Sequence, residues 1–397
     1  AVVTADSLDI SSIKNMPVSR SVTKIDWSIG QIEKGGYEHF MHKEIHDQPE
    51  ALSNAIRGRL LEKDGTTKLS GIRMTPADLV RINRISIAAC GTSYYAGMVG
   101  KYYFEELAGI SADVEQAAEF RYRNPIIERD TCMLAISQSG ETADTIEAVR
   151  EAERKGAIVL GICNVVGSTI ARESKRGVYL HAGPEIGVAS TKAFTCQIAV
   201  LAMLAIALGR ARRMSSAAGR ALVRELKRAP DIARAVLEQE PEIRRIAEKY
   251  ADAEHMFFLG RGYMYPAALE GALKLKEISY IHAEGYHAAE LKHGPIALLD
   301  EHVPVVVAVP DIPGKSKTIS NIQECMARKS PVIAIASSGD TDVNDISADV
   351  IRVPGCTDFL SPIPVVIAEQ LFAYHVAKCR GCSIDQPRNL AKSVTVE

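Results

Sequence analysis

One pattern of strand, turn and helix occurs twice in this chain, about 170 residues apart. "RISIAACGTSYYAGMVGKYYFEEL" (84–107) corresponds to "HMFFLGRGYMYPAALEGALKLKEISY" (255–280). "CMLAISQSGETADTIEAVREAERKGAIVLGICN" (132–164) likewise corresponds to "VPVVVAVPDIPGKSKTISNIQECMARKSPVIAIAS" (303–337). The offset exceeds the 20 to 50 residues typical of solenoid repeats, so it indicates a duplication of a whole domain.

Apolar strands alternate with helices in both copies, which predicts parallel sheets covered by helices on both faces. We therefore expect an α/β protein with two doubly wound domains, at residues 80–215 and 251–384. A charged helical connector should fill residues 216–250. Residues 1–79 are expected to hold a linker remnant and a helical preamble, and residues 385–397 to form a separate C-terminal tail.

Composition excludes several classes of protein. The 397 residues include 47 basic and 49 acidic ones, a net charge of −2, and no basic run interleaved with aromatic residues, so no nucleic-acid partner is expected. No apolar run reaches the roughly 18 to 20 residues of a membrane span. Eight cysteines in this length fit a reduced, cytoplasmic protein. Cys379 and Cys382 form one C-x-x-C, which could be half a zinc site or a redox pair, but ordinary thiols are favoured because no second such pair follows.

Polar side chains gather where the strand of residues 132–136 becomes a helix: Ser137, Gln138, Ser139 and Thr142. Ligands of open parallel sheets bind beyond the carboxyl ends of the strands, and a helix N-terminus there attracts anions. These side chains could be simple helix caps. Their number, with Ser93 in the neighbouring turn, favours a small phosphate held by neutral donors. Neither a GxxxxGK(S/T) nor a GxGxxG pattern accompanies them.

The second copy has lost this polar turn and carries ionisable groups instead. Lys274 and Glu277 are three residues apart on a predicted helix and share a face. Such a pair is often a solvated ion pair, but this helix is mostly apolar, and burial would raise the pKa of Glu277 toward that of a useful base. His293, in "KHGP", suits proton transfer near neutral pH. We find no metal-ligand spacing in these segments, so neither a metal nor a cofactor is expected.

The C-terminal "SIDQPRNLAKSVTVE" has little helical or strand period. Disorder is the default expectation for such a tail. It also carries Arg388 and Lys392, and a lysine amine can form an imine with a ketose.

Six segments together carry a resemblance: "CGTSYYAG" (90–97), "ISQSGETADT" (136–145), "GPEIGVASTKAFT" (183–195), "ALKLKEISYIHAEGY" (272–286), "ELKHGP" (290–295) and "DQPRNLAKSVTVE" (385–397). They resemble the C-terminal, sugar-isomerase half of the glutamine–fructose-6-phosphate aminotransferases. The first two segments occur throughout the wider sugar-isomerase (SIS) family, and the last four are specific to these enzymes. The resemblance implies flavodoxin-like SIS domains, a homodimer, and fructose 6-phosphate as substrate.

The resemblance also implies residue roles. His293 opens the sugar ring and reaches into the neighbouring subunit's site. Lys392 forms a Schiff base with C2 of the open ketose, and ammonia then displaces it. Glu277 moves a proton from C1 to C2 while Lys274 supports charge on a nearby sugar oxygen, giving glucosamine 6-phosphate. The residues implied to bind the sugar phosphate are Thr92, Ser93, Ser137, Gln138, Ser139, Thr142, Val188, Ser190 and Ala391.

One departure from the family qualifies this reading. The family has an N-terminal glutaminase with an N-terminal cysteine nucleophile, whereas this chain starts at Ala1 and its first cysteine is Cys90. We therefore expect isomerisation of fructose 6-phosphate, with amination from free ammonia but not from glutamine. Two alternatives remain: a fructosamine-phosphate deglycase, which the tail argues against, and a silent sugar-phosphate sensor, which would have lost Glu277, His293 and Lys392.

Overall fold

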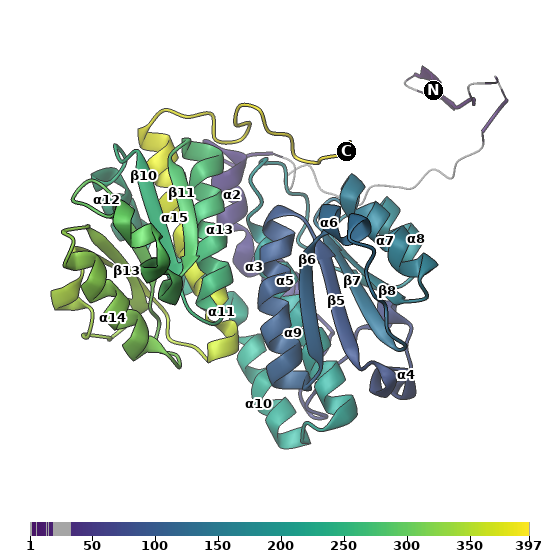
Figure 1. Ribbon diagram of the computed structural model, residues 1–397. Helices are drawn as coiled ribbons and strands as arrows, with labels where there is room; N and C mark the ends of the chain where they lie inside the picture. Colours follow the sequence, from purple (N-terminus) through teal and green to yellow (C-terminus); the bar gives the residue numbers. More distant parts are fainter. Residues whose placement is uncertain (1, 5, 13, 15, 19–32, 397) are drawn as a thin grey trace.

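The computed structural model describes residues 2–4, 6–12, 14, 16–18 and 33–396. Part of the predicted linker remnant, including residues 19–24, lies outside these residues. Within them, two five-stranded parallel sheets each carry their own helices (Figure 1). The predicted α/β class with two parallel-sheet domains is thus confirmed.

The two sheets have the same strand order. The first sheet runs β6-β5-β7-β8-β9 and the second β11-β10-β12-β13-β14. Within each sheet, counted along the chain, this is the order 2-1-3-4-5 of flavodoxin-like folds, with the switch point between strands one and three. The strands are β5 (Arg84–Ala89), β6 (Ser111–Gln116), β7 (Thr131–Ser137), β8 (Ile158–Cys163), β9 (Gly177–Tyr179), β10 (His255–Gly260), β11 (His282–His287), β12 (Val305–Ala308), β13 (Val332–Ser337) and β14 (Asp349–Val353).

Helices cover both faces of each sheet, which is why the central strands are buried along their whole length. The first domain has α5 (Gly91–Tyr103), a π-helical turn (Phe104–Ala108), α6 (Ala117–Tyr122), α7 (Ala143–Arg154), α8 (Thr169–Ser174) and α9 (Lys192–Arg212). The second has α13 (Met264–Ser279), α14 (Lys315–Met326) and α15 (Pro362–Cys379), with short 3-10 helices at Ala288–His293, Pro295–Leu298, Asn344–Ile346 and Asp358–Leu360.

Two helical segments, Lys192–Arg212 and Asp358–Cys379, are apolar and long enough to cross a membrane. The apolar window of each is wholly buried inside the fold. Both therefore fit the role of core helices, around which their domains pack.

The preamble and the connector pack onto the domains. The preamble contains α2 (Phe40–His46), α3 (Gln48–Ile56) and α4 (Pro76–Arg81), with short strand pairs at Val2–Val3, Leu8–Asp9, Leu60–Leu61 and Thr66–Thr67. The connector consists of α10 (Ser216–Lys227), α11 (Ala229–Leu237) and α12 (Glu240–Lys249). Helix α2 packs against α15, and α3 packs against α9 and α11, so these two helices lie between the domains (Figure 1). Helix α4 packs against α9 at the outer side of the first domain, and the strands Val2–Val3 and Leu8–Asp9 lie away from both domains.

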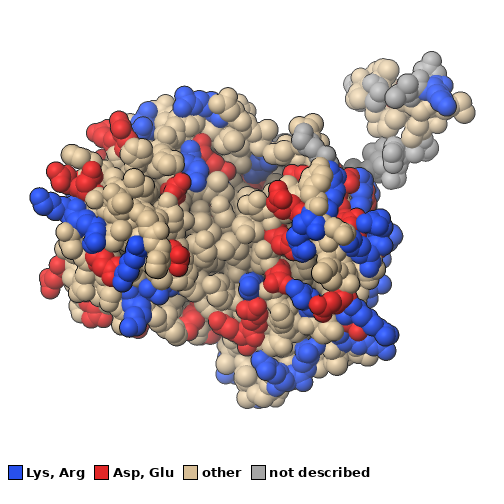
Figure 2. Space-filling model, in the orientation of Figure 1, with Lys and Arg blue, Asp and Glu red and all other residues tan. Residues whose placement is uncertain are grey.

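The tail leaves α15 and crosses from the second domain toward the first (Figure 1). Charges of both signs are interspersed over the face seen in Figure 2, and the hollow between the two halves is mostly uncharged. This agrees with the near-neutral net charge of −2.

A buried tyrosine joins the two domains. The Tyr103 hydroxyl, at the end of α5, donates to the Phe359 carbonyl of the second domain. Its ring also lies 5.6 Å from that of Tyr263 and 6.1 Å from that of Phe359, centroid to centroid. Burial raises the pKa of Tyr103 well above its ordinary value, so this hydroxyl stays a donor.

Tyr103→Phe should lower the free energy of unfolding by about 1–2 kcal/mol, because the buried Phe359 carbonyl loses its donor while the packing is kept. Chemical denaturation measures this change. Tyr122→Phe, at a position 69% exposed, is the matched control and should change stability by less than about 0.5 kcal/mol. Equal changes in the free energy of unfolding of the two variants would contradict a stabilising role of the Tyr103–Phe359 hydrogen bond.

Candidate active site

The polar turn after β7 is organised by its own side chains. The Ser137 hydroxyl accepts from the Gly140 amide and lies 3.0 Å from the Thr142 hydroxyl. Thr142 precedes α7 but makes no side-chain cap to it. Gly140 has φ +67°, and a Cβ there would lie 2.0 Å from the Ser168 hydroxyl, so the turn needs glycine. The polar side chains therefore shape a tight turn at the switch point and are not ordinary helix caps.

The C-terminal tail docks on this turn. The Ser139 and Ser393 hydroxyls lie 3.0 Å apart, and the Ala143 amide donates to the Val394 carbonyl at 3.1 Å. The tail therefore brings Lys392, the neighbour of Ser393, to the edge of the predicted phosphate turn.

Lys392 is held by the loop that precedes α9. Its Nζ donates to Glu185 Oε2 at 2.7 Å and to the Gly187 carbonyl at 2.8 Å. The other Glu185 oxygen accepts from the Thr191 and Ala193 amides at 2.9 and 3.0 Å. Burial alone would raise the pKa of Glu185, but the Lys392 charge and these donors lower it to about 2. Glu185 is thus an ionised, fully buried partner for the lysine.

A second carboxylate, from the preamble, fixes the same loop. Glu44 on α2 accepts from the Ile186 amide and from the Gly187 amide. Burial and the nearby Glu185 charge raise the pKa of Glu44 to about 8. The tail completes the loop, since the Val188 amide donates to the Asp385 carbonyl at 3.0 Å. Preamble, loop and tail therefore form one unit around Lys392.

The remaining predicted residues of this loop are less constrained. Val188 is half-buried, and its side chain takes part in no polar contact. The Ser190 hydroxyl is buried and has no hydrogen-bond partner among the described residues. An unsatisfied hydroxyl in the loop that holds Lys392 is available to a ligand.

The ionisable groups of α13 form a chain of contacts that reaches the first domain. Lys274 Nζ lies 2.7 Å from Glu277 Oε2 and 3.4 Å from Glu270 Oε1. It also donates to the Thr92 hydroxyl at 3.1 Å, and that hydroxyl donates to Glu270 at 3.1 Å. The predicted shared face of Lys274 and Glu277 is thus present, and Thr92 links it to the turn after β5.

Burial governs the protonation of this cluster. Burial disfavours a charge on Lys274, but Glu270 and Glu277 outweigh it and raise its pKa, with a smaller contribution from Glu185. Burial raises the pKa of Glu270 to about 8. On α15, burial and the nearby Glu270 raise the pKa of Glu369 well above its ordinary value. Lys274 is therefore the permanent charge, and Glu277, with 21% of its side chain exposed, is the carboxylate that a ligand can reach.

The other predicted residues lie at varying distances from these groups. The buried Ser93 hydroxyl accepts from Gln197 Nε2 at 2.9 Å. Gln138 lines a cavity of about 680 Å³ together with Asn164, Gly183, Pro184 and Glu185. Ala391 is exposed next to Lys392. His293 is exposed at the end of a 3-10 helix, and no described contact joins it to Glu277 or Lys392 within one chain.

Sequence reasoning missed Glu185, Glu270, Glu44 and Ser393. Glu185 stands inside the "GPEIGVAS" segment, and Glu270 stands four residues before Lys274 on the same helix face, so a signal for both was present. The role of Glu44 depends on how α2 packs, which no local pattern reveals.

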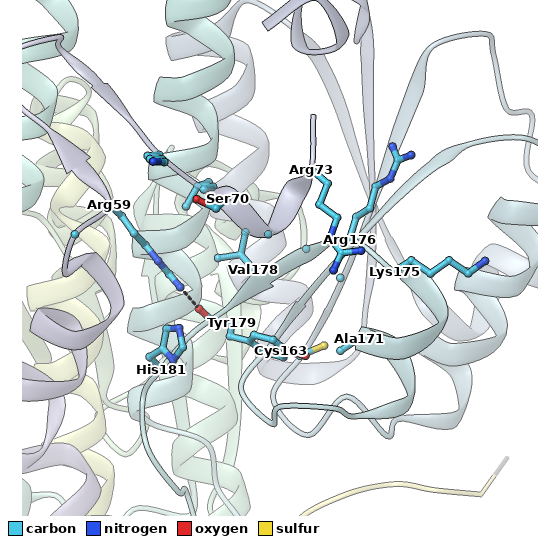
Figure 3. Close-up of a pocket in the computed structure, with 16 residues that line it drawn as sticks. Arg59, Ser70, Arg73, Cys163, Ala171, Lys175, Arg176, Val178, Tyr179 and His181 are labelled. Atoms are coloured by element: carbon cyan, nitrogen blue, oxygen red, sulfur yellow. Dashed lines mark hydrogen bonds between the residues drawn. The ribbon is translucent and has the colours of Figure 1, made fainter. Parts of the chain in front are cut away.

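A second pocket, of about 460 Å³, is open beside β9 (Figure 3). In Figure 3 Arg59 reaches toward the Tyr179 carbonyl, to which it donates at 2.8 Å, and Arg73 lies beside Arg176. None of the predicted site residues lines this pocket. It is therefore separate from the site built around Lys392.

Comparison with known proteins gives a consistent result. The SIS domain family matches residues 78–207 and 249–378. Glutamine–fructose-6-phosphate aminotransferase (isomerizing) of Chlorobaculum tepidum is 54% identical over 397 residues, which are 100% of this chain and 65% of that protein. The enzyme of the same name from Thermus thermophilus is 50% identical over 396 residues, with the same coverage. This chain thus spans about two thirds of the length of these curated relatives.

Comparison with solved structures indicates the same family. The C-terminal domain of glucosamine-fructose-6-phosphate aminotransferase from Francisella tularensis matches with a TM-score of 0.85 and 42% identity, over 89% of this chain and 100% of that chain. A putative phosphosugar isomerase from Silicibacter pomeroyi matches with a TM-score of 0.72 and 25% identity, over 87% and 100% of the two chains. The chain belongs to the SIS-domain family and, within it, to the glutamine–fructose-6-phosphate aminotransferases, of which it corresponds to the C-terminal, isomerase half.

Proposed function

We propose that this chain binds fructose 6-phosphate and converts it to glucosamine 6-phosphate when ammonia is supplied, and to glucose 6-phosphate when it is not. The observation that carries the proposal is the position of Lys392. An ion pair to Glu185 and the contact of Ser393 with Ser139 hold this lysine at the polar turn. An amine next to a phosphate-sized anion site suits a phosphorylated ketose.

The phosphate end would bind at the turn after β7. Ser137, Gln138, Ser139 and Thr142 offer neutral donors there, and α7 starts with Ala143. The helix N-terminus adds a partial positive charge. Thr92, Ser93, Val188, Ser190 and Ala391 would line the rest of the sugar site.

Imine formation needs Lys392 as a neutral amine. The Lys392 charge is what holds the pKa of Glu185 near 2. When that charge is lost, burial favours a protonated Glu185, so this carboxylate can take the proton that Lys392 gives up. Attack of the amine on C2 of the open ketose then expels water and forms the imine, and ammonia displaces Lys392 by the same exchange.

The isomerisation follows at C1 and C2. The imine acidifies the C1–H bond, so a carboxylate base suffices. Glu277 would remove the C1 proton and return it to C2, while the charged Lys274 at 2.7 Å holds that carboxylate and stabilises a developing negative charge on the sugar oxygen. Without ammonia, water hydrolyses the Lys392 imine back to the open ketose, and the same proton transfer through an enediol gives glucose 6-phosphate. No cofactor is required for these steps.

Ring opening is assigned to His293 of a second subunit. Within one chain His293 is exposed and lies on a segment anchored to α14 by the 2.6 Å ion pair between Lys292 and Glu324. An exposed histidine on an anchored segment can enter a neighbouring site. We therefore propose a homodimer that shares His293.

The relatives that this chain matches are longer, since it covers 65% of them. We propose that a glutaminase partner domain, as in the enzymes named above, supplies the ammonia in the cell. The reaction would be the first step of amino-sugar synthesis, carried out in the cytoplasm.

The overall reaction is tested by giving this 397-residue chain fructose 6-phosphate with no nitrogen source, with an ammonium salt, or with glutamine. We expect glucose 6-phosphate in the first assay and glucosamine 6-phosphate only in the second. Binding of fructose 6-phosphate without either product would favour a sensor over an enzyme. Glutamine-dependent product would contradict the assignment of this chain to the isomerase half alone.

Lys392→Ala should lower turnover at least about 100-fold, because no amine is left to form the imine. Borohydride reduction in the presence of fructose 6-phosphate should attach the sugar covalently to Lys392 in the unmodified chain, as peptide mass spectrometry can show. Lys378→Ala, at an exposed pair with Glu38, should retain both activity and trapping. Undiminished trapping in Lys392→Ala would exclude the imine role.

The shared histidine is tested by mixing two inactive variants, His293→Ala and Lys392→Ala. If His293 acts across the subunit interface, a mixed dimer contains one complete site and activity returns to a fraction of that of the unmodified chain. If His293 acts within its own chain, each mixed site lacks one residue and the mixture stays inactive. Refolding the two variants together and separately gives the comparison.

A further inference from the structure

Three histidines surround one carboxylate where three distant parts of the chain meet. His42 and His46 belong to α2, His375 to α15, and Glu240 is the first residue of α12. The Nε2 atoms of His42 and His375 lie 2.6 and 2.9 Å from Glu240 Oε1, and that of His46 lies 2.8 Å from Oε2. Donor atoms of His42, Glu240 and His375 all lie within 4.8 Å of one another.

Local structure explains why these groups converge. His42 and His46 are four residues apart on α2 and therefore share one helix face. His42 stacks on Tyr374, with ring centroids 4.4 Å apart, and Tyr37 packs against both α2 histidines at 5.1 and 5.3 Å. The side chains of the three histidines and Glu240 are between 7% and 23% exposed, so the cluster is partly covered and lies close to the protein surface.

The composition of the cluster exceeds what neutralising one carboxylate requires. One imidazolium would balance Glu240, yet three imidazoles direct the same ring nitrogen at it. Two of these imidazole nitrogens, of His42 and His375, lie close to each other as well as to Glu240. Two imidazoles and one carboxylate are the protein ligands of zinc sites that keep a fourth position open. Imidazole ligands also suit other late transition metals, whereas Mg²⁺ and Ca²⁺ prefer oxygen ligands.

We propose that His42, His375 and Glu240 bind a divalent late transition-metal ion of the Zn²⁺ class, with His46 beside the second oxygen of Glu240. Metal–ligand bonds of about 2.0 Å in a tetrahedron place ligand atoms about 3.3 Å apart. The Nε2 atoms of His42 and His375 lie 2.6 and 2.9 Å from Glu240 Oε1, a few tenths of an ångström closer than that. Binding therefore needs small movements of these side chains.

Such an ion would stabilise the position of α2 rather than take part in the chemistry. Helix α2 also carries Glu44, which holds the loop at Ile186 and Gly187. Its first amides, of Phe40 and Met41, donate to the Asp385 carboxylate at 2.9 Å each. An ion that joins α2 to α12 and α15 would therefore fix the position of the helix that holds both the loop and the tail. The proposal concerns metal binding itself and does not depend on the reaction proposed above.

The test uses the full chain, stripped of metal with a chelator and then titrated with Zn²⁺ or Co²⁺, with Mg²⁺ as the negative probe. We expect one Zn²⁺ per chain, a Co²⁺ absorption spectrum of tetrahedral type, and a higher Tm with Zn²⁺ than without it. His42→Gln and Glu240→Gln should each weaken Zn²⁺ binding at least about tenfold. His39→Gln, which changes a histidine on the same segment that is hydrogen-bonded to Tyr374 but is not a member of the cluster, should bind Zn²⁺ as the unmodified chain does.

Two results would overturn the proposal. One is the absence of Zn²⁺ uptake by the unmodified chain, which would leave the cluster as a hydrogen-bonded network. The other is Zn²⁺ binding that is unchanged in His42→Gln. Because the His42 side chain is 19% exposed, this variant should fold even if variants of the more buried His375 do not.

Discussion

The ion pair between Lys392 and Glu185 is the interaction on which the site depends. A carboxylate with no exposed side-chain surface is costly to ionise unless a charge and hydrogen-bond donors surround it. The Lys392 ammonium and the amides of Thr191 and Ala193 provide them. The same pair ties the end of the chain to the loop before α9, and Ser393 then meets the turn after β7. Together with the hydrogen bond between the Val188 amide and the Asp385 carbonyl, the pair thus couples the loop to the tail beside the polar turn.

The two copies of the fold carry different polar groups at corresponding places. Both have the strand order of a flavodoxin-like domain, and both present a turn at the switch point. Only the first copy keeps serine and threonine there. The second copy instead contributes Lys274 and Glu277 from α13, and Lys274 touches Thr92 of the first copy at 3.1 Å. Domain packing, through α5, α13 and the buried Tyr103, therefore determines how the two sets of groups meet.

Several features of the fold and the site could be predicted from the sequence, because they depend on residues that are close together in the chain. The strand–helix alternation predicts the two parallel sheets, and the spacing of three residues predicts the contact of Lys274 with Glu277. The hydroxyl-rich turn also lies where the carboxyl ends of parallel strands place it. Other features depend on packing over long distances in the chain: Glu185 and Lys392 are 207 residues apart, and the Glu240–His375 contact joins residues 135 apart. Hydrophobic periodicity and local propensity cannot predict contacts between residues so far apart in the chain.

The sequence by itself determined the fold class, the duplication and the types of chemical group available, because these follow from hydrophobic period and residue identity. Only the tertiary structure decided which groups are paired and which are left free for a ligand. Burial is the physical reason: it raises the pKa of Glu270 and of Glu44 to about 8, and it makes an ionised Glu185 depend on the charge of Lys392. It also opposes the charge on Lys274, which is kept only because Glu270 and Glu277 lie beside it. Protonation and pairing follow from the depth at which each side chain is packed, and that depth exists only in the folded chain.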